Sequence, residues 1–121
     1  MSKKILVVED TEDNRRIMCD LLTAAGYAYI EATDGEAGVA MALAERPDLV
    51  LMDIQLPVID GYEATRRIKA DPVTAAIPVI AVTSYALAGD EAKTRAAGCI
   101  GHVAKPFSPR QLLALVRQLI G

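Results

Sequence analysis

The chain has 121 residues, a formal net charge of -3 and an isoelectric point near 5.1. This length is typical of one domain that can bury a hydrophobic core. The acidic balance argues against nucleic-acid or membrane binding, and no apolar stretch approaches the roughly 20 residues that a membrane-spanning helix needs. No signal-peptide pattern precedes the first apolar run, so we expect a cytoplasmic protein. Cys19 and Cys99 lack metal-ligand spacing, and we expect reduced thiols in an apolar core.

Apolar runs of strand length alternate with amphipathic segments of helix length. We predict strands at about 4–8, 28–32, 48–53, 78–83 and 100–104, and helices at about 13–25, 35–45, 61–70, 89–98 and 108–120. Repeated βα units of this kind form a parallel sheet with right-handed crossovers, so helices should cover both of its faces. The strand at 28–32 is mixed in polarity and is expected at an edge, whereas 48–53 is apolar and is expected in the middle.

Four of the predicted strands end at polar residues. Glu9 and Asp10 follow the first strand, Asp53 ends the third, Thr83 ends the fourth and Lys105 follows the fifth. In an open parallel sheet, ligands bind in the crevice beyond the carboxyl ends of the strands. If these strands are neighbours, three carboxylates, one hydroxyl and one ammonium group converge at one place.

This set of groups is suited to phosphoryl chemistry. Three crowded carboxylates repel one another and need a cation to stay ionised, and hard oxygen ligands with room for water suit Mg²⁺. Asp53 is the candidate nucleophile, because a carboxylate can attack phosphorus and give an acyl phosphate. Thr83 and Lys105 are the candidates for contact with phosphoryl oxygens. Each residue alone has an ordinary explanation, such as a solvated turn for the two adjacent acids, and only the full set indicates this site.

Four motifs carry a resemblance to a known family. They are Val7-Val8-Glu9-Asp10, Leu51-Met52-Asp53-Ile54-Gln55-Leu56-Pro57 followed by Asp60-Gly61, Val82-Thr83-Ser84, and Lys105-Pro106-Phe107. With these motifs the chain resembles the response-regulator receiver domain of two-component and phosphorelay signalling from 4 to 120, and within that family the stand-alone DivK type. The resemblance implies a flavodoxin-like doubly wound (βα)5 fold, with five parallel strands in the order 2-1-3-4-5. It also implies a single receiver domain over 1–121 without an output domain.

The resemblance assigns roles to the acidic residues. It makes Asp53 the phosphoacceptor, Asp10 a direct Mg²⁺ ligand and Glu9 a ligand through water. The main-chain carbonyl of Gln55 is implied as a third protein ligand, beside Asp10 and Asp53. The phosphodonor implied is a phosphohistidine on a histidine kinase or a histidine phosphotransfer protein.

The resemblance also implies a switch. Thr83 becomes the switch hydroxyl and Lys105 the phosphate partner. The sequence departs from the family pattern at Ser84, where Ala often follows the switch hydroxyl, and at His102, where Tyr or Phe is usual. A lone histidine is most often an ordinary surface or core residue. At this position the resemblance places it between the phosphorylation site and the partner surface, so we expect switching to persist with altered strength.

Two partner surfaces are expected. One, on the first helix, would dock the phosphodonor, and the other, near the fourth and fifth helices, would bind a downstream protein. The residues expected there are Asn14 and Ile17 for the donor, and Tyr85, Leu87, Leu113 and Ile120 for the downstream partner. Leu113 and Ile120 project away from the main apolar stripe of their helix and should be partly exposed.

Rival functions meet specific obstacles in the sequence. A flavin-binding flavodoxin-like protein needs a phosphate-cradling loop after the first strand, where this chain has acids. An aspartyl-phosphate phosphatase generally needs an acid two residues after the nucleophile, where Gln55 stands. A receiver excised from a hybrid histidine kinase shares all the motifs, and a phosphorylation-independent receiver tends to lose the acids or the lysine. We expect a signalling receiver that catalyses only its own phosphorylation and slow dephosphorylation.

Overall fold

The computed structural model describes residues 3–84, 88–105 and 108–121, in which five strands alternate with five helices. The strands are β1 (Lys4–Val8), β2 (Ala28–Ala32), β3 (Leu49–Asp53), β4 (Val79–Thr83) and β5 (Gly101–Ala104). The helices are α1 (Glu12–Ala24), α2 (Gly35–Glu45), α3 (Gly61–Ala70), α4 (Ala88–Ala97) and α5 (Pro109–Ile120). None of the helices in the described part of the chain is long and apolar enough to cross a membrane.

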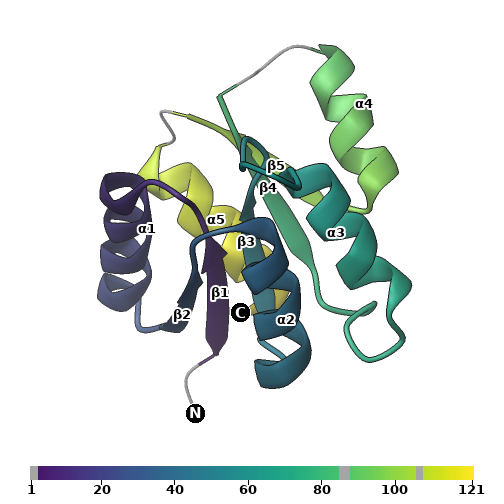
Figure 1. Cartoon of the computed structure of the whole chain (residues 1–121). Coiled ribbons are helices and arrows are strands. Elements are labelled where there is room, and N and C mark those ends of the chain that lie inside the picture. Colours follow the sequence, from purple (N-terminus) through teal and green to yellow (C-terminus); the bar gives the residue numbers. More distant parts are fainter. Residues whose placement is uncertain (1–2, 85–87, 106–107) are drawn as a thin grey trace.

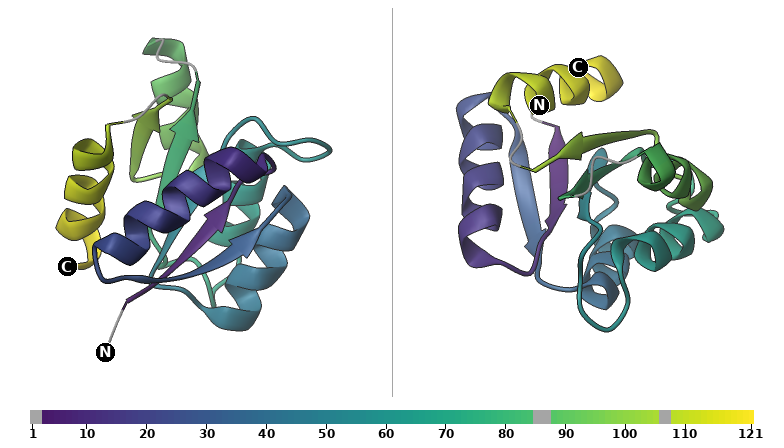
Figure 2. Two further views of the ribbon diagram at one scale, coloured as in Figure 1. Left: turned by 90° about the vertical axis from the view of Figure 1, so that its left-hand side faces the viewer. Right: turned by 90° about the horizontal axis from the view of Figure 1, so that it is seen from above.

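The strands form one parallel sheet in the order β2-β1-β3-β4-β5. Helices α1 and α5 cover one face, and α2, α3 and α4 cover the other (Figures 1 and 2). The predicted doubly wound fold is therefore confirmed, with β2 at an edge and β3 in the centre. This order places the carboxyl ends of β1, β3 and β4 side by side.

The sheet separates two hydrophobic clusters. Along β1, Ile5 and Val7 face α1 and α5, whereas Leu6 and Val8 face α2 and α3, because successive side chains of a strand point to opposite faces. All four are fully buried, which explains why β1 is apolar at every one of these positions. The two cysteines are free and buried, and they belong to opposite clusters.

The start of α3 is packed tightly against the end of β3. The N–H of Gly61 donates to the carbonyl of Ile54 at 2.9 Å, and a Cβ atom at position 61 would clash with the carbonyl oxygen of Asp53. Asp60 caps the helix by accepting the N–H of Glu63 at 2.9 Å. Only glycine permits this approach, so the loop after Asp53 is held close to the end of the sheet.

Val58, in this same loop, has an unfavourable backbone conformation. Its φ is 69° and its side chain is 94% exposed, so no packing compensates for the left-handed conformation of a β-branched residue. Asparagine tolerates this conformation better. We expect Val58→Asn to raise the free energy of unfolding by about 1 kcal/mol, measured by urea denaturation. Val73→Asn is the control, because Val73 is also exposed but has no positive φ; equal effects of the two changes would contradict the explanation by strain.

Candidate functional site

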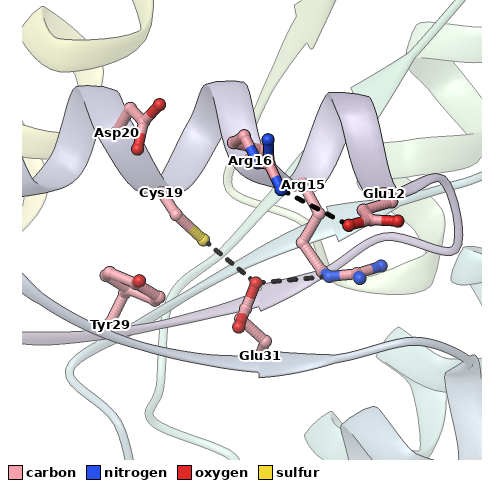
Figure 3. Close-up of a pocket in the computed structure, with 7 residues that line it drawn as sticks. All are labelled: Glu12, Arg15, Arg16, Cys19, Asp20, Tyr29 and Glu31. Atoms are coloured by element: carbon pink, nitrogen blue, oxygen red, sulfur yellow. Dashed lines mark hydrogen bonds and ion pairs between the residues drawn. The ribbon is translucent and has the colours of Figure 1, made fainter.

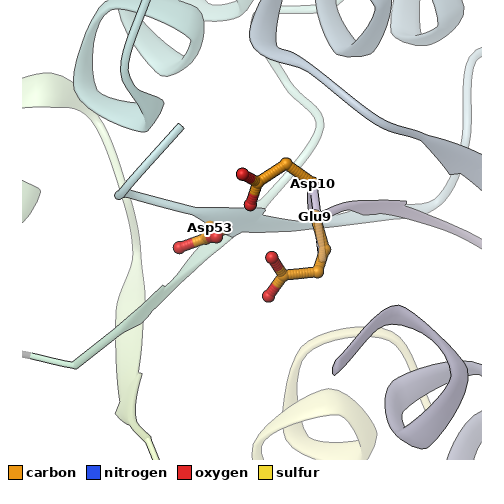
Figure 4. Close-up of side chains that lie close together, drawn as sticks. All are labelled: Glu9, Asp10 and Asp53. Carbon is orange, nitrogen blue, oxygen red and sulfur yellow. The ribbon is translucent and has the colours of Figure 1, made fainter. Parts of the chain in front are cut away.

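The three predicted carboxylates meet at the carboxyl edge of the sheet. Glu9 and Asp10 follow β1, Asp53 ends the neighbouring strand β3, and one oxygen from each lies within 4.8 Å of the others (Figure 4). Glu9 is fully buried and Asp53 is 2% exposed, whereas Asp10 is exposed. The adjacent acids are therefore not a solvated turn, because one of them points into the protein.

Lys105 brings a positive charge to the two buried acids. Its Nζ donates to Glu9 Oε1 at 2.7 Å and lies 3.4 Å from Asp53 Oδ2. The main-chain N–H of Lys105 donates to the carbonyl of Thr83, which continues the pairing of β4 and β5 beyond the end of β5. This pairing fixes the position of the Lys105 main chain. The four methylene groups of its side chain then reach from there to the end of β1.

The charges in the site are not balanced. Burial, which is the largest cause, and the neighbouring Asp53 raise the pKa of Glu9 to about 7, although hydrogen bonds from Lys105 and Thr11 oppose the shift. Burial lowers the pKa of Lys105, but its hydrogen bond to Glu9 and the charges of Glu9 and Asp53 outweigh burial and raise that pKa overall. One ammonium group thus serves two buried carboxylates, and a third, exposed carboxylate lies beside them. A cation is the ligand that this imbalance favours.

The donor set fits Mg²⁺. Asp10 accepts no hydrogen bond from any residue that the structure describes, so its oxygens are available, whereas Glu9 is engaged by Lys105 and by the N–H of Thr11. Gln55 lies at the site, because its N–H donates to Asp53 Oδ1 at 3.0 Å. Hard carboxylate oxygens on an open, partly solvated edge are the environment that this ion prefers. The carbonyl of Gln55 as a ligand stays a prediction.

The predicted switch residues lie on β4 and β5. Thr83 is buried at the end of β4, one position beyond Val82, which pairs with Asp53. His102 is half-buried on β5 and pairs with Ala81, so it lies below the edge where the acids meet.

A contact that sequence reasoning missed joins the two loops beside the switch. The side-chain Oε1 of Gln55 accepts the N–H of Ser84 at 3.3 Å. The loop that follows the candidate phosphoacceptor is thereby tied to the residue that follows the candidate switch hydroxyl. No sequence pattern signals this contact, since 29 positions separate its partners.

The predicted partner residues that the structure describes lie on two helices, α1 and α5. On α1, Asn14 is half-buried and Ile17 is 52% exposed. On α5, Leu113 and Ile120 are half-buried as expected, but they also pack against the core between the sheet and α1. Tyr85 and Leu87 lie outside the described residues.

Comparison with known proteins agrees with this architecture. Residues 5–117 match the response regulator receiver domain family. The chain is 40% identical over all its 121 residues to the polar-differentiation response regulator DivK of Brucella anthropi, and it covers 98% of that protein.

Solved structures give the same result. The receiver domain of the sensor histidine kinase PA1611 from Pseudomonas aeruginosa is 38% identical, with a TM-score of 0.93 and coverage of 100% of this chain and 99% of that one; it has a magnesium ion coordinated in its active site cleft. The chemotaxis response regulator CheY4 of Vibrio cholerae is 27% identical, with a TM-score of 0.92 and coverage of 98% and 99%.

Fold and site together define a CheY-like signalling domain of two-component systems. The chain belongs to the response regulator receiver domain family, and its full-length similarity to DivK confirms the resemblance noted from the motifs.

The raised pKa of Glu9 predicts how stability depends on pH. Between about 4.5 and 7 the folded protein retains a proton that the unfolded chain has released, so the free energy of unfolding of the metal-free protein falls as pH rises. Glu9→Gln cannot ionise and removes this contribution. We expect the wild type to lose roughly 2 kcal/mol relative to the Gln variant between about pH 5 and about pH 8, measured by urea denaturation with a chelator present. A difference that stays constant across this range would contradict the assignment.

Proposed function

We propose that the chain is a phosphorylation-activated switch that accepts a phosphoryl group on Asp53 and then changes its protein-binding face. The observation that carries the proposal is the contact of Lys105 with both Glu9 and Asp53 at an edge that also holds Asp10. A charge-assisted cluster of this kind would neutralise an incoming phosphoryl group and the carboxylate that receives it.

The proposed reaction transfers a phosphoryl group from a phosphohistidine on a histidine kinase or phosphotransfer protein. A carboxylate oxygen of Asp53 forms the new P–O bond as the P–N bond breaks, and the electron pair of that bond returns to the imidazole. Gln55 orients the Asp53 carboxylate through its N–H, and Lys105 offers its ammonium group to the phosphoryl oxygens. Asp10, Asp53, the carbonyl of Gln55 and, through water, Glu9 would hold Mg²⁺. When bound, that ion supplies neutralisation of the charge that gathers on the phosphoryl oxygens.

The proposed switch links this site to β5. Thr83 would turn its hydroxyl toward the phosphoryl oxygens, and His102 would follow by changing how far its ring lies inside the protein. The bond between Gln55 and Ser84 supports this route, because a shift of either loop would pull on the other. An imidazole fills less space than the more usual phenol, so the inward state of His102 should be less strongly favoured.

The proposed partners use separate faces. The phosphodonor would dock on α1 at Asn14 and Ile17, and the downstream protein would bind near α4, β5 and α5, where Leu113 and Ile120 lie. Full-length similarity to DivK supports a stand-alone regulator, whereas the similarity to the PA1611 receiver favours a second candidate, a receiver that works within a hybrid histidine kinase. These two candidates can be distinguished by comparing the rates of phosphotransfer from several separate kinases to the isolated chain. A receiver that works within a hybrid kinase should accept the phosphoryl group fastest from its own kinase.

Phosphorylation can be tested with a small donor. With acetyl phosphate and Mg²⁺, we expect the protein to gain one phosphoryl group at Asp53, seen by intact-mass spectrometry and lost in hydroxylamine, because acyl phosphates are labile to this nucleophile. Asp53→Asn should abolish the label. An undiminished label in the Asn variant, or labelling that needs no divalent metal, would overturn the proposal.

Donor docking can be tested separately from the chemistry. Ile17→Ala should slow phosphotransfer from a protein donor several-fold, because roughly 1 kcal/mol of apolar contact is lost, and should leave labelling by acetyl phosphate unchanged. Leu43→Ala is the matched control, since Leu43 is 44% exposed on α2, on the other face of the sheet. Equal slowing of both donors by Ile17→Ala would show that the change had damaged the phosphorylation site instead.

A further inference from the structure

Arg15, on the first full turn of α1, contacts the main chain behind the acidic site. Its Nη1 donates to the carbonyl oxygen of Glu9 at 3.1 Å. Its Nε donates to Glu31 Oε1 at 3.2 Å, as Figure 3 shows. The Arg15 side chain is only 17% exposed, so its guanidinium group is held in place and does not move freely in solvent. One side chain therefore links α1, the end of β1 and the edge strand β2.

The main chain of Glu9 is held on both sides. Its N–H donates to the carbonyl of Ala32 at 3.1 Å, and its carbonyl accepts from Arg15. Ala32 directly follows Glu31, which orients Arg15, so both bonds lead to the same end of β2. The edge strand thus fixes the point at which the chain leaves the sheet and enters the acidic pair.

This bond bears directly on Asp10. The carbonyl of Glu9 and the N–H of Asp10 belong to one planar peptide unit, so holding that oxygen also sets the direction in which the chain continues to Asp10. The carboxylate of Glu9 is fixed separately, by Lys105 and by the N–H of Thr11. The exposed Asp10 has no such contact of its own among the described residues, so the Glu9 peptide is the held group nearest to it along the chain.

Glu31 completes the support. It pairs with Val7 in the β1–β2 register, and its Oε1 accepts the thiol of Cys19 at 3.5 Å in addition to Arg15. Burial and the charge of Glu31 raise the pKa of Cys19 to about 12, so this thiol stays protonated and serves as a donor. The surroundings of Cys19 are therefore less apolar than the sequence predicted, since a carboxylate from β2 faces it.

We propose that Arg15 is a positioning residue for the phosphorylation site. It orients the Glu9–Asp10 peptide so that Asp10 is presented toward Asp53, and Glu31 holds Arg15 in the orientation that this requires. The inference rests on the proposed function of Asp10 as a metal ligand. Partners that orient ligands from behind a metal site contribute about 10-fold to 100-fold in metal affinity.

Two readouts test this role. We expect Arg15→Ala to weaken Mg²⁺ binding about 10-fold, measured by calorimetry. In the metal-free protein it should also speed amide hydrogen exchange at Glu9 and Thr11, while Val50 in the centre of the sheet exchanges as before. Arg15→Lys, which cannot reach both acceptors, and Glu31→Gln, which keeps an acceptor oxygen but loses the charge, should give intermediate values.

Arg16→Ala is the matched control. Arg16 lies on the same helix turn, but it pairs with Glu12 on the surface, where the two side chains are 70% and 74% exposed. Its loss should leave both readouts unchanged. Wild-type Mg²⁺ affinity in Arg15→Ala, or equal acceleration of exchange at Val50, would overturn the positioning role. If the wild type itself binds no Mg²⁺, the proposed function fails, and the exchange rates of Glu9 and Thr11 alone then decide whether Arg15 orients this turn.

Discussion

The ammonium group of Lys105 donates a 2.7 Å hydrogen bond to the fully buried carboxylate of Glu9 and lies 3.4 Å from the buried carboxylate of Asp53. Removing charges from water is costly unless they are paired, and here one positive charge faces two negative ones. This shortage of positive charge is partly relieved because the pKa of Glu9 is raised to about 7, so that its carboxyl is partly protonated near neutral pH. The remaining deficit makes the site receptive to a divalent cation, and through it to a phosphoryl group.

The sheet order is what assembles these charges. Glu9, Asp53 and Lys105 are far apart in the sequence. They meet because β1 and β3 are neighbours in the sheet, and only β4 lies between β3 and β5. The strands that carry the acids are buried on both faces, so their ends have little freedom to move apart. The close contact at Gly61 fixes the loop after β3, and the bond from Arg15 fixes the turn after β1. The site is thus held by rigid elements on both sides.

The sequence predicted the elements within one residue, because most strands are short apolar runs and polar or small residues mark the helix ends. It also predicted that the acids, Thr83 and Lys105 would share one edge, since alternation of strands and helices implies a parallel sheet. The order of the strands came from the resemblance to the receiver family. Local pattern alone leaves several orders open.

Contacts between distant side chains were beyond sequence reasoning. The apolar neighbours of Cys19 in the sequence suggested an apolar environment, but Glu31 approaches this helical residue from strand β2. The link from Arg15 to Glu9 and Glu31 has no motif of its own, because it depends on how α1 lies against β2. The left-handed conformation of Val58 is likewise set by the tight loop between β3 and α3, and a valine gives no hint of it.

The charge deficit at Glu9 can be measured through the protons that Mg²⁺ binding releases. Titration calorimetry at pH 7 in buffers of different ionisation enthalpy gives the number of protons released per ion. With a Glu9 pKa of about 7, the carboxyl is half protonated in the metal-free protein, so binding of the ion should release about half a proton. Glu9→Gln should release none from this position. Binding without proton release in the wild type, or an undiminished release in the Gln variant, would contradict a site organised around this buried acid.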